Sequence, residues 1–237
     1  MNKMKKTTLL GILASGTLLF GSAMPVMAAA TSTADTDATV TFKENNTGPT
    51  TPVDPEDPDI DNPGVPGTGN EGPLSLDYAS TFDFGTHDVP TTDQVYTALD
   101  DTAGDGSTAN YVQVTDQRAG EVKGWTLSVA QNGQLTAEKS ARTLDGAQIQ
   151  IGTGTVKSGS ENTSGTPVSS TVDLDTNGAS SVVMDAAAGN GFGTWVDAFG
   201  TKGSSTVKLA VPVESHPDAD KYTSKLTWTL SELPDNA

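Results

Sequence analysis

The chain has 237 residues, of which 34% are hydrophobic and 5% aromatic, and it contains no cysteine. Its acidic excess gives a formal net charge of −17 at pH 7, which argues against nucleic acid or an anionic membrane as partner because such binding depends on Lys and Arg. The length allows one large domain that builds its own core without disulfides, and the missing cysteines exclude thiolate catalysis and sulfur-ligated metals.

The N-terminus has the three parts of an export signal. A basic start, "MNKMKK", precedes the apolar stretch "TTLLGILASGTLLF" and the small residues "VMAAA", which predicts a signal peptide over residues 1–28. A membrane anchor is the weaker alternative, because the apolar run is short and contains Gly and Ser. Cleavage would remove three lysines and no acid, so the net charge would fall from −17 to −20. Export without cysteine is typical of a bacterial exoprotein.

Two segments of different composition follow. In residues 29–46, "ATVTF" alternates and predicts a possible strand over 38–42, with Val40 and Phe42 on one face. Residues 47–73 are rich in Pro, Asp and Glu and have little to bury, which indicates a solvated spacer or an excursion loop. A calcium site in "DPEDPDID" is disfavoured, because prolines hinder the chain from wrapping its carboxylates around one ion.

Strand-like alternation becomes dense from residue 74 to residue 237. The segments with this pattern are "LSLDYASTFDFGT", "YVQVTD", "VKGWTLSVAQN", "AQIQIG", "TVKLAVPV" and "YTSKLTWTLSEL". Turn signals such as "QNGQ", "LDGA" and "TNGA" stand between them. Residues 182–199 come nearest to a helix, but their glycines oppose one. We therefore expect a single all-β domain, an antiparallel β-sandwich or barrel-like fold.

Catalytic signatures are missing from the sequence. The two histidines, His87 and His216, stand in polar turns, and no G-x-S-x-G, H-E-x-x-H or P-loop motif occurs. In "DLDTNG", Asp173, Asp175 and Asn177 have the spacing of an EF-hand loop, but Met184 takes the place of the final Glu. A β-turn is the favoured interpretation. We expect no enzyme activity, no metal and no cofactor.

The tetrapeptide "WTLS" occurs twice. Period-two geometry places Trp125 with Leu127, and Trp228 with Leu230, on one apolar strand face opposite a face of hydroxyl side chains. These four residues are candidate binding residues, because exposed aromatics stack on sugars or protein partners. The alternative, that they belong to the core, is favoured because apolar residues at period two are typical of a buried strand face.

The two W-x-L motifs, together with "GPLSLDYASTFDFGT", "YVQVTDQRAGEVKGWTLSVAQNGQL" and "VKLAVPVESHPDADKYTSKLTWTLSELP", resemble the WxL family of surface proteins from low-GC Gram-positive bacteria. The resemblance implies a cell-surface domain attached non-covalently to the cell wall through peptidoglycan. It also implies assembly with other surface proteins and, in some members, binding of host or extracellular-matrix components. It does not imply that the motif side chains touch glycan.

The end of the chain fits non-covalent attachment. "LPDNA" lacks the Thr and Gly of a sortase signal, and we expect no membrane contact after signal cleavage. A secreted adhesin for host components is the main alternative function, and a secreted polysaccharide hydrolase is a weaker one. Because the wall is also anionic, the acid excess predicts that wall binding strengthens as the pH falls.

Overall fold

The computed structural model describes residues 32–43, 45 and 48–232. The predicted signal peptide, residues 1–28, and the final "LPDNA", residues 233–237, therefore lie outside the described residues. The chain divides into two compact units at Thr41 and Phe42. Residues 32–43 contain no strand, and Val40 and Phe42 are 73% and 87% exposed. The strand expected over residues 38–42 therefore does not form in this structure.

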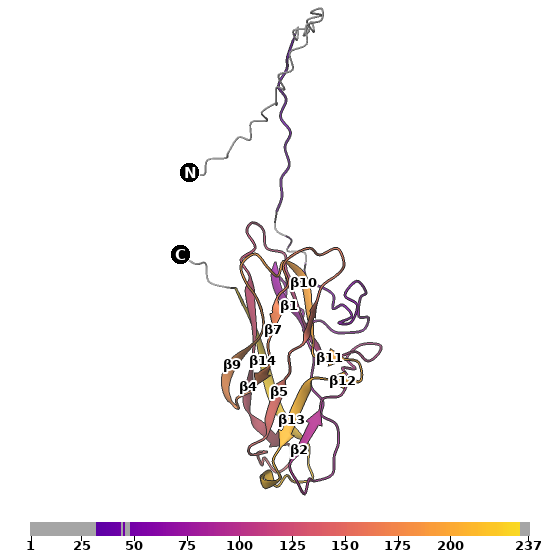
Figure 1. The fold of residues 1–237 in the computed structure, drawn as a ribbon, viewed down its shortest axis with the longest axis vertical. Coiled ribbons are helices and arrows are strands. Elements are labelled where there is room, and N and C mark those ends of the chain that lie inside the picture. The colour runs from indigo at the N-terminus through magenta and orange to yellow at the C-terminus, as the bar shows by residue number, and fades with distance from the viewer. Residues whose placement is uncertain (1–31, 44, 46–47, 233–237) are drawn as a thin grey trace, which may run out of the picture. The chain divides into compact units, whose positions relative to one another are not determined.

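Three four-stranded antiparallel sheets make up the fold of the second unit (Figure 1). The first has the order β1 (Leu74–Ala79), β3 (Tyr111–Asp116), β10 (Gly193–Ala198), β6 (Thr155–Lys157). The second has the order β2 (Gln94–Thr97), β13 (Val207–Val211), β5 (Gln148–Ile151), β8 (Val172–Asp173). The third has the order β14 (Tyr222–Glu232), β4 (Trp125–Ala137), β9 (Asn177–Ala186), β7 (Val168–Ser169). A small ribbon pairs β11 (Gly200–Thr201) with β12 (Ser204–Ser205), and a 3-10 turn, η1, spans Val213–Ser215.

One hydrophobic core joins the three sheets. Each contributes fully buried side chains, including Val112 and Val114 from β3, Ile151 from β5 and Met184 from β9. Each of the six segments predicted from alternation after residue 73 contains a strand, although β1 ends at Ala79 and residues 80–86 of the first segment are not part of it. The all-β antiparallel prediction is confirmed. Among the described residues, no helix is long and apolar enough to span a membrane.

Residues 182–199, the segment that comes nearest to a helix in sequence, contain no helix in the structure. The segment forms the end of β9 and all of β10, joined by a glycine-rich loop. The end of β9 from Val183 onward is largely buried, as is β10, whereas the first half of β9 is exposed. The "QNGQ" signal is also not a turn, because β4 runs through it from Trp125 to Ala137. Gly133 there has a φ of +91° and lies beside an irregularity in the register, so this turn signal marks a bulge within a long strand.

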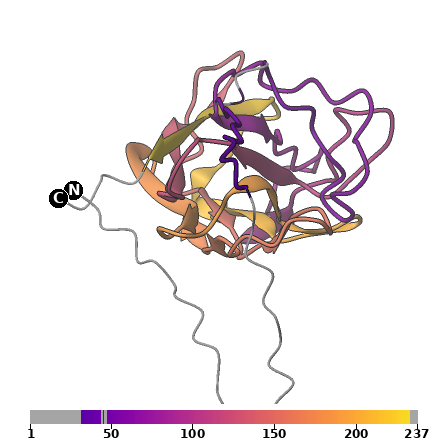
Figure 2. The ribbon, with the colours of Figure 1, turned by 90° about the horizontal axis from the view of Figure 1, so that it is seen from above.

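The acidic, proline-rich segment packs on the outer face of the first sheet. The Gln113 side chain of β3 accepts a hydrogen bond from Val53 N–H (2.8 Å) and donates one to Thr51 C=O (3.1 Å). Asn62 Nδ2 donates to the hydroxyl of Tyr111 at 3.3 Å. Seen from above, the violet segments lie along one side of the fold (Figure 2). As a result β3 is buried on both faces, and residues 51–62 are a packed loop rather than a solvated spacer.

Candidate functional site

The two W-x-L motifs lie on neighbouring antiparallel strands. Leu127 of β4 pairs directly with Leu230 of β14, while Trp125 pairs with Glu232 and Trp228 with Val129. The four candidate residues thus share one sheet, with the two indoles offset along the strands. Their side chains face the core or pack against it.

Trp125 is fully buried, at 0% exposure. Its indole Nε1 donates a hydrogen bond to the carbonyl oxygen of Gly191 at 3.0 Å. Gly191 has a φ of +80°, and a Cβ there would lie 2.7 Å from Trp125 Nε1, so only glycine fits. Leu127 is also 0% exposed. Neither side chain offers a surface to a ligand; Trp125 instead fixes the loop between β9 and β10.

The second motif is closer to solvent. Trp228 and Leu230 are half-buried and pack against the core. The indole of Trp228 stacks on Phe199 (centroids 6.4 Å apart, interplanar angle 17°) and meets Phe82 edge-on at 6.5 Å. This motif therefore closes the core beneath the segment that carries Phe82.

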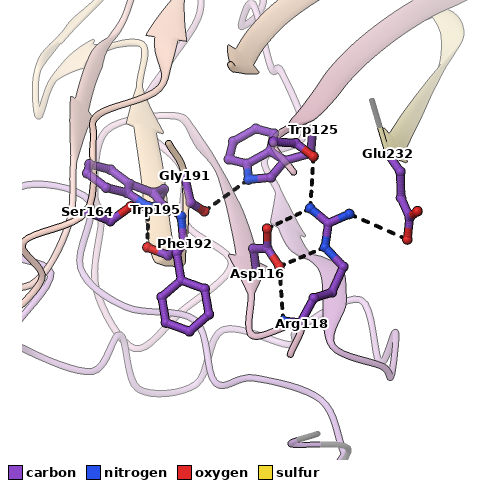
Figure 3. A network of polar contacts seen from close by, with 9 residues as sticks. Asp116, Arg118, Trp125, Ser164, Gly191, Phe192, Trp195 and Glu232 are labelled. Carbon is purple, nitrogen blue, oxygen red and sulfur yellow. Dashed lines mark hydrogen bonds and ion pairs between the residues drawn. The ribbon is translucent and has the colours of Figure 1, made fainter. Parts of the chain in front are cut away.

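An arginine network links the ends of β3, β4 and β14 (Figure 3). Arg118 Nη2 donates to Asp116 Oδ2 at 2.7 Å and to Gly124 C=O at 2.8 Å, and Nε donates to Asp116 Oδ1 at 2.9 Å. Its Nη1 also lies 3.5 Å from Glu232. The hydrogen bonds to Asp116 raise the pKa of Arg118 above its ordinary value. The network fixes the start of the first motif against the end of the second.

A groove of about 720 Å³ lies beside the loop that Trp125 supports. Four segments line it: Val53 with residues 58–59 of the acidic segment, Val122 before β4, residues 158–159 and 161–164 after β6, and Gly189 with residues 192–194. Backbone bonds tie the walls together. Gly189 N–H donates to Val122 C=O and Gly191 N–H to Gly165 C=O, both at 2.8 Å.

Phe192 stands at this groove with 42% of its surface exposed. Its N–H donates to Ser164 Oγ at 3.1 Å, and its carbonyl oxygen accepts from Asn162 Nδ2 and Trp195 Nε1, both at 3.0 Å. In Figure 3 the ring extends away from these contacts. The backbone of an exposed aromatic residue is thus held by three hydrogen bonds.

Sequence reasoning did not identify this groove. Phe192, Asn162 and Ser164 were not candidates, although a phenylalanine between glycines in "GNGFG" is a signal for an aromatic residue on a tight loop. The EF-hand-like segment forms a turn, in which Asp175 Oδ1 accepts Asn177 N–H at 3.0 Å. Within the described residues, no group of three or more metal-ligating side chains is close enough to hold an ion.

Comparison with known proteins gives one family. No curated protein and no solved structure matches the chain. A family model described as "WxL domain surface cell wall-binding" matches residues 29–234. The match starts well before residue 74, so it includes the acidic segment that the sequence placed outside the domain. The chain therefore belongs to the WxL family of surface cell-wall-binding domains.

Proposed function

We propose that this protein attaches non-covalently to the cell wall by binding peptidoglycan, and that it is not an enzyme. The family match supports a cell-surface protein that binds the cell wall. The observation that carries the finer proposal is the preformed groove, which presents an exposed aromatic ring beside hydroxyl and amide side chains. Concave sites with an apolar wall and a few polar groups are typical of ligand binding.

The acid excess limits which wall component fits. Among the described residues that line the groove, none is Lys or Arg, whereas Asp59 and Glu161 are acidic. Teichoic phosphates and peptide carboxylates are therefore repelled there. Peptidoglycan without its anionic polymers is the component that meets least repulsion.

The direct test is retention of the purified exported chain on wall sacculi before and after teichoic acids are removed. We expect retention on both, and at least equal retention on the stripped material. Failure to bind either would contradict the proposal.

Immobilised host matrix tests the adhesin alternative: binding to matrix but not to sacculi would favour it. Release of reducing sugars from peptidoglycan would contradict the non-catalytic part.

The pH dependence follows from charge. As the pH falls from about 7 to about 4.5, carboxylates on the protein and the wall become protonated and their repulsion weakens. We expect stronger retention on sacculi at the lower pH. Weaker retention by protein that circular dichroism shows to be folded would contradict this account.

Assembly with other surface proteins is a second part of the proposal. The outer strand β14 has 11 residues and pairs within the described fold only with β4. An outer strand presents backbone N–H and C=O groups to which another chain can add a strand. Size-exclusion chromatography with a larger surface protein from the same organism tests for a complex. Independent elution of every such protein would count against assembly.

A further inference from the structure

We propose that Phe192 is the stacking platform of a glycan-binding groove, on which a neutral N-acetylated sugar ring of the peptidoglycan backbone lies. This inference rests on the proposed wall-binding function and assigns it to one site. Four observations carry it: the exposure of the ring, the hydrogen bonds to its backbone, the composition of the groove, and the link to the first W-x-L motif.

The ring is exposed although nearly all other aromatic side chains of the described fold are buried or half-buried. Phe192 and Phe42 are the aromatic residues among the large hydrophobic side chains that are exposed in the described part of the chain. Of the two, only Phe192 lines the groove. Exposing an aromatic ring forfeits the stability gained by burying it, and a ring at a groove provides a flat apolar surface for a ligand.

The backbone of the platform is hydrogen-bonded in the structure without any ligand. It makes the three hydrogen bonds to Ser164, Asn162 and Trp195 described above. Asn162 holds both sides of the groove, since its Nδ2 also donates to Ser158 Oγ at 2.7 Å and its Oδ1 accepts Ser164 N–H at 2.9 Å. A side chain on an ordered backbone loses less conformational entropy on binding, which favours affinity.

The chemistry of the groove selects a sugar over the other wall components. A pyranose ring has an apolar face of C–H groups, which packs on the negative face of an aromatic ring, and a rim of hydroxyl groups. Asp59 and Glu161 provide carboxylate oxygens that accept hydrogen bonds from such hydroxyls. Without Lys or Arg among its described lining residues, the groove offers no counter-charge to a phosphate or a carboxylate.

The first copy of the duplicated W-x-L motif has a role in this site. Trp125 is not a ligand contact, because it is fully buried. Through its hydrogen bond to Gly191 it positions the residue directly before Phe192. The first motif is thus a positioning element for the platform.

The test measures binding of the full exported chain to teichoic-acid-free peptidoglycan, with a β-1,4-linked N-acetylglucosamine hexamer as soluble competitor. We expect Phe192→Ala to weaken binding by about tenfold, as the loss of an aromatic stacking contact predicts. Phe192→Tyr, which keeps the ring, should bind like the wild type. Phe192→Leu keeps an apolar side chain without a ring and should bind as weakly as the Ala variant. Phe42→Ala is the matched control and should have no effect.

The outcomes separate this inference from the wall-binding function. Wild-type protein that binds peptidoglycan, with Phe192→Ala or Phe192→Leu binding equally well, would overturn the platform and leave the function standing. A hexamer that does not compete would also overturn it, because the ligand would then not be the sugar backbone. Wild-type protein that fails to bind peptidoglycan would overturn both. Thermal unfolding of each variant verifies folding, and a half-exposed side chain predicts little change.

Discussion

The two W-x-L motifs have nearly the same sequence but different surroundings. Trp125 is fully buried, donates to Gly191 and sits against a glycine-lined loop. Trp228 is half-buried and makes aromatic contacts with Phe82 and Phe199. The two copies of the motif lie side by side on paired strands, yet they have different structural roles. The first copy supports the loop beside the groove, and the second copy closes the core.

The largest effect is expected for Trp125→Ala. It leaves a large cavity in the core and an unpaired carbonyl at Gly191, so we expect a loss of about 5 kcal/mol in the free energy of unfolding. Chemical denaturation followed by far-UV circular dichroism measures it. If Trp125→Ala lowered the free energy of unfolding by no more than Trp228→Ala does, the claim that the two motifs differ in burial and role would be contradicted.

The first sheet, which does not carry the motifs, has its own effect on stability, which depends on pH through Asp197 of β10. This side chain is fully buried, and neither carboxylate oxygen makes a hydrogen bond of ordinary geometry. Burial raises the pKa of Asp197 to about 7, with the nearby Ser169 hydroxyl lowering it in part.

The sign of the effect follows from proton binding. The folded state retains a proton between about pH 4 and pH 7 that the unfolded state has lost, so stability falls as the pH rises through this range. We expect the wild type to lose about 2 to 3 kcal/mol through this group between about pH 5 and pH 8. Asp197→Asn should remove that part of the loss. An unchanged pH dependence in Asp197→Asn would show that Asp197 does not cause it.

A smaller effect is expected for Trp228→Ala. Since the indole is half-buried, we expect a loss of about 2 kcal/mol, below the range for a fully buried tryptophan. Wall binding of the folded protein should persist, because Trp228 does not line the groove. Loss of binding without loss of folding would mean that the second motif contacts the ligand directly.

The smallest effect is expected for Glu232→Gln. The Glu232 side chain is 60% exposed and 3.5 Å from Arg118, and an exposed ion pair contributes less than about 1 kcal/mol. The backbone pairing of β4 with β14 should keep the two motifs together without this contact. A loss as large as that of Trp228→Ala, in the same denaturation assay, would show that the link through Glu232 matters more than its exposure indicates.

Some of this arrangement follows from local sequence. β4 and β14 have one face toward the core and one toward solvent, so apolar and polar residues alternate and the strands are predictable. The burial of β3 on both faces is harder to predict, because its outward Gln113 is covered by residues some 60 positions earlier in the chain. Polar residues and prolines are typical of exposed loops, and the contacts that bury them here are long-range.

The groove could not be predicted for the same reason. Its shape depends on contacts among Trp125, Asn162, Ser164 and Gly191, which lie far apart in the sequence. No local period encodes such contacts. Only the glycine-flanked phenylalanine was visible, and an aromatic residue within a loop indicates neither a site nor a ligand by itself.

The central claim is that the first motif, and not the second, supports the binding groove, and a matched pair of variants tests it most directly. Trp125→Phe removes the donor to Gly191 and Trp228→Phe keeps an aromatic ring at the other motif, and both are measured for binding to teichoic-acid-free peptidoglycan. We expect Trp125→Phe to weaken binding by about three- to tenfold, as loss of a buried hydrogen bond predicts, and Trp228→Phe to bind like the wild type. Equal affinities for folded Trp125→Phe and wild type, or a larger loss in Trp228→Phe, would contradict the account.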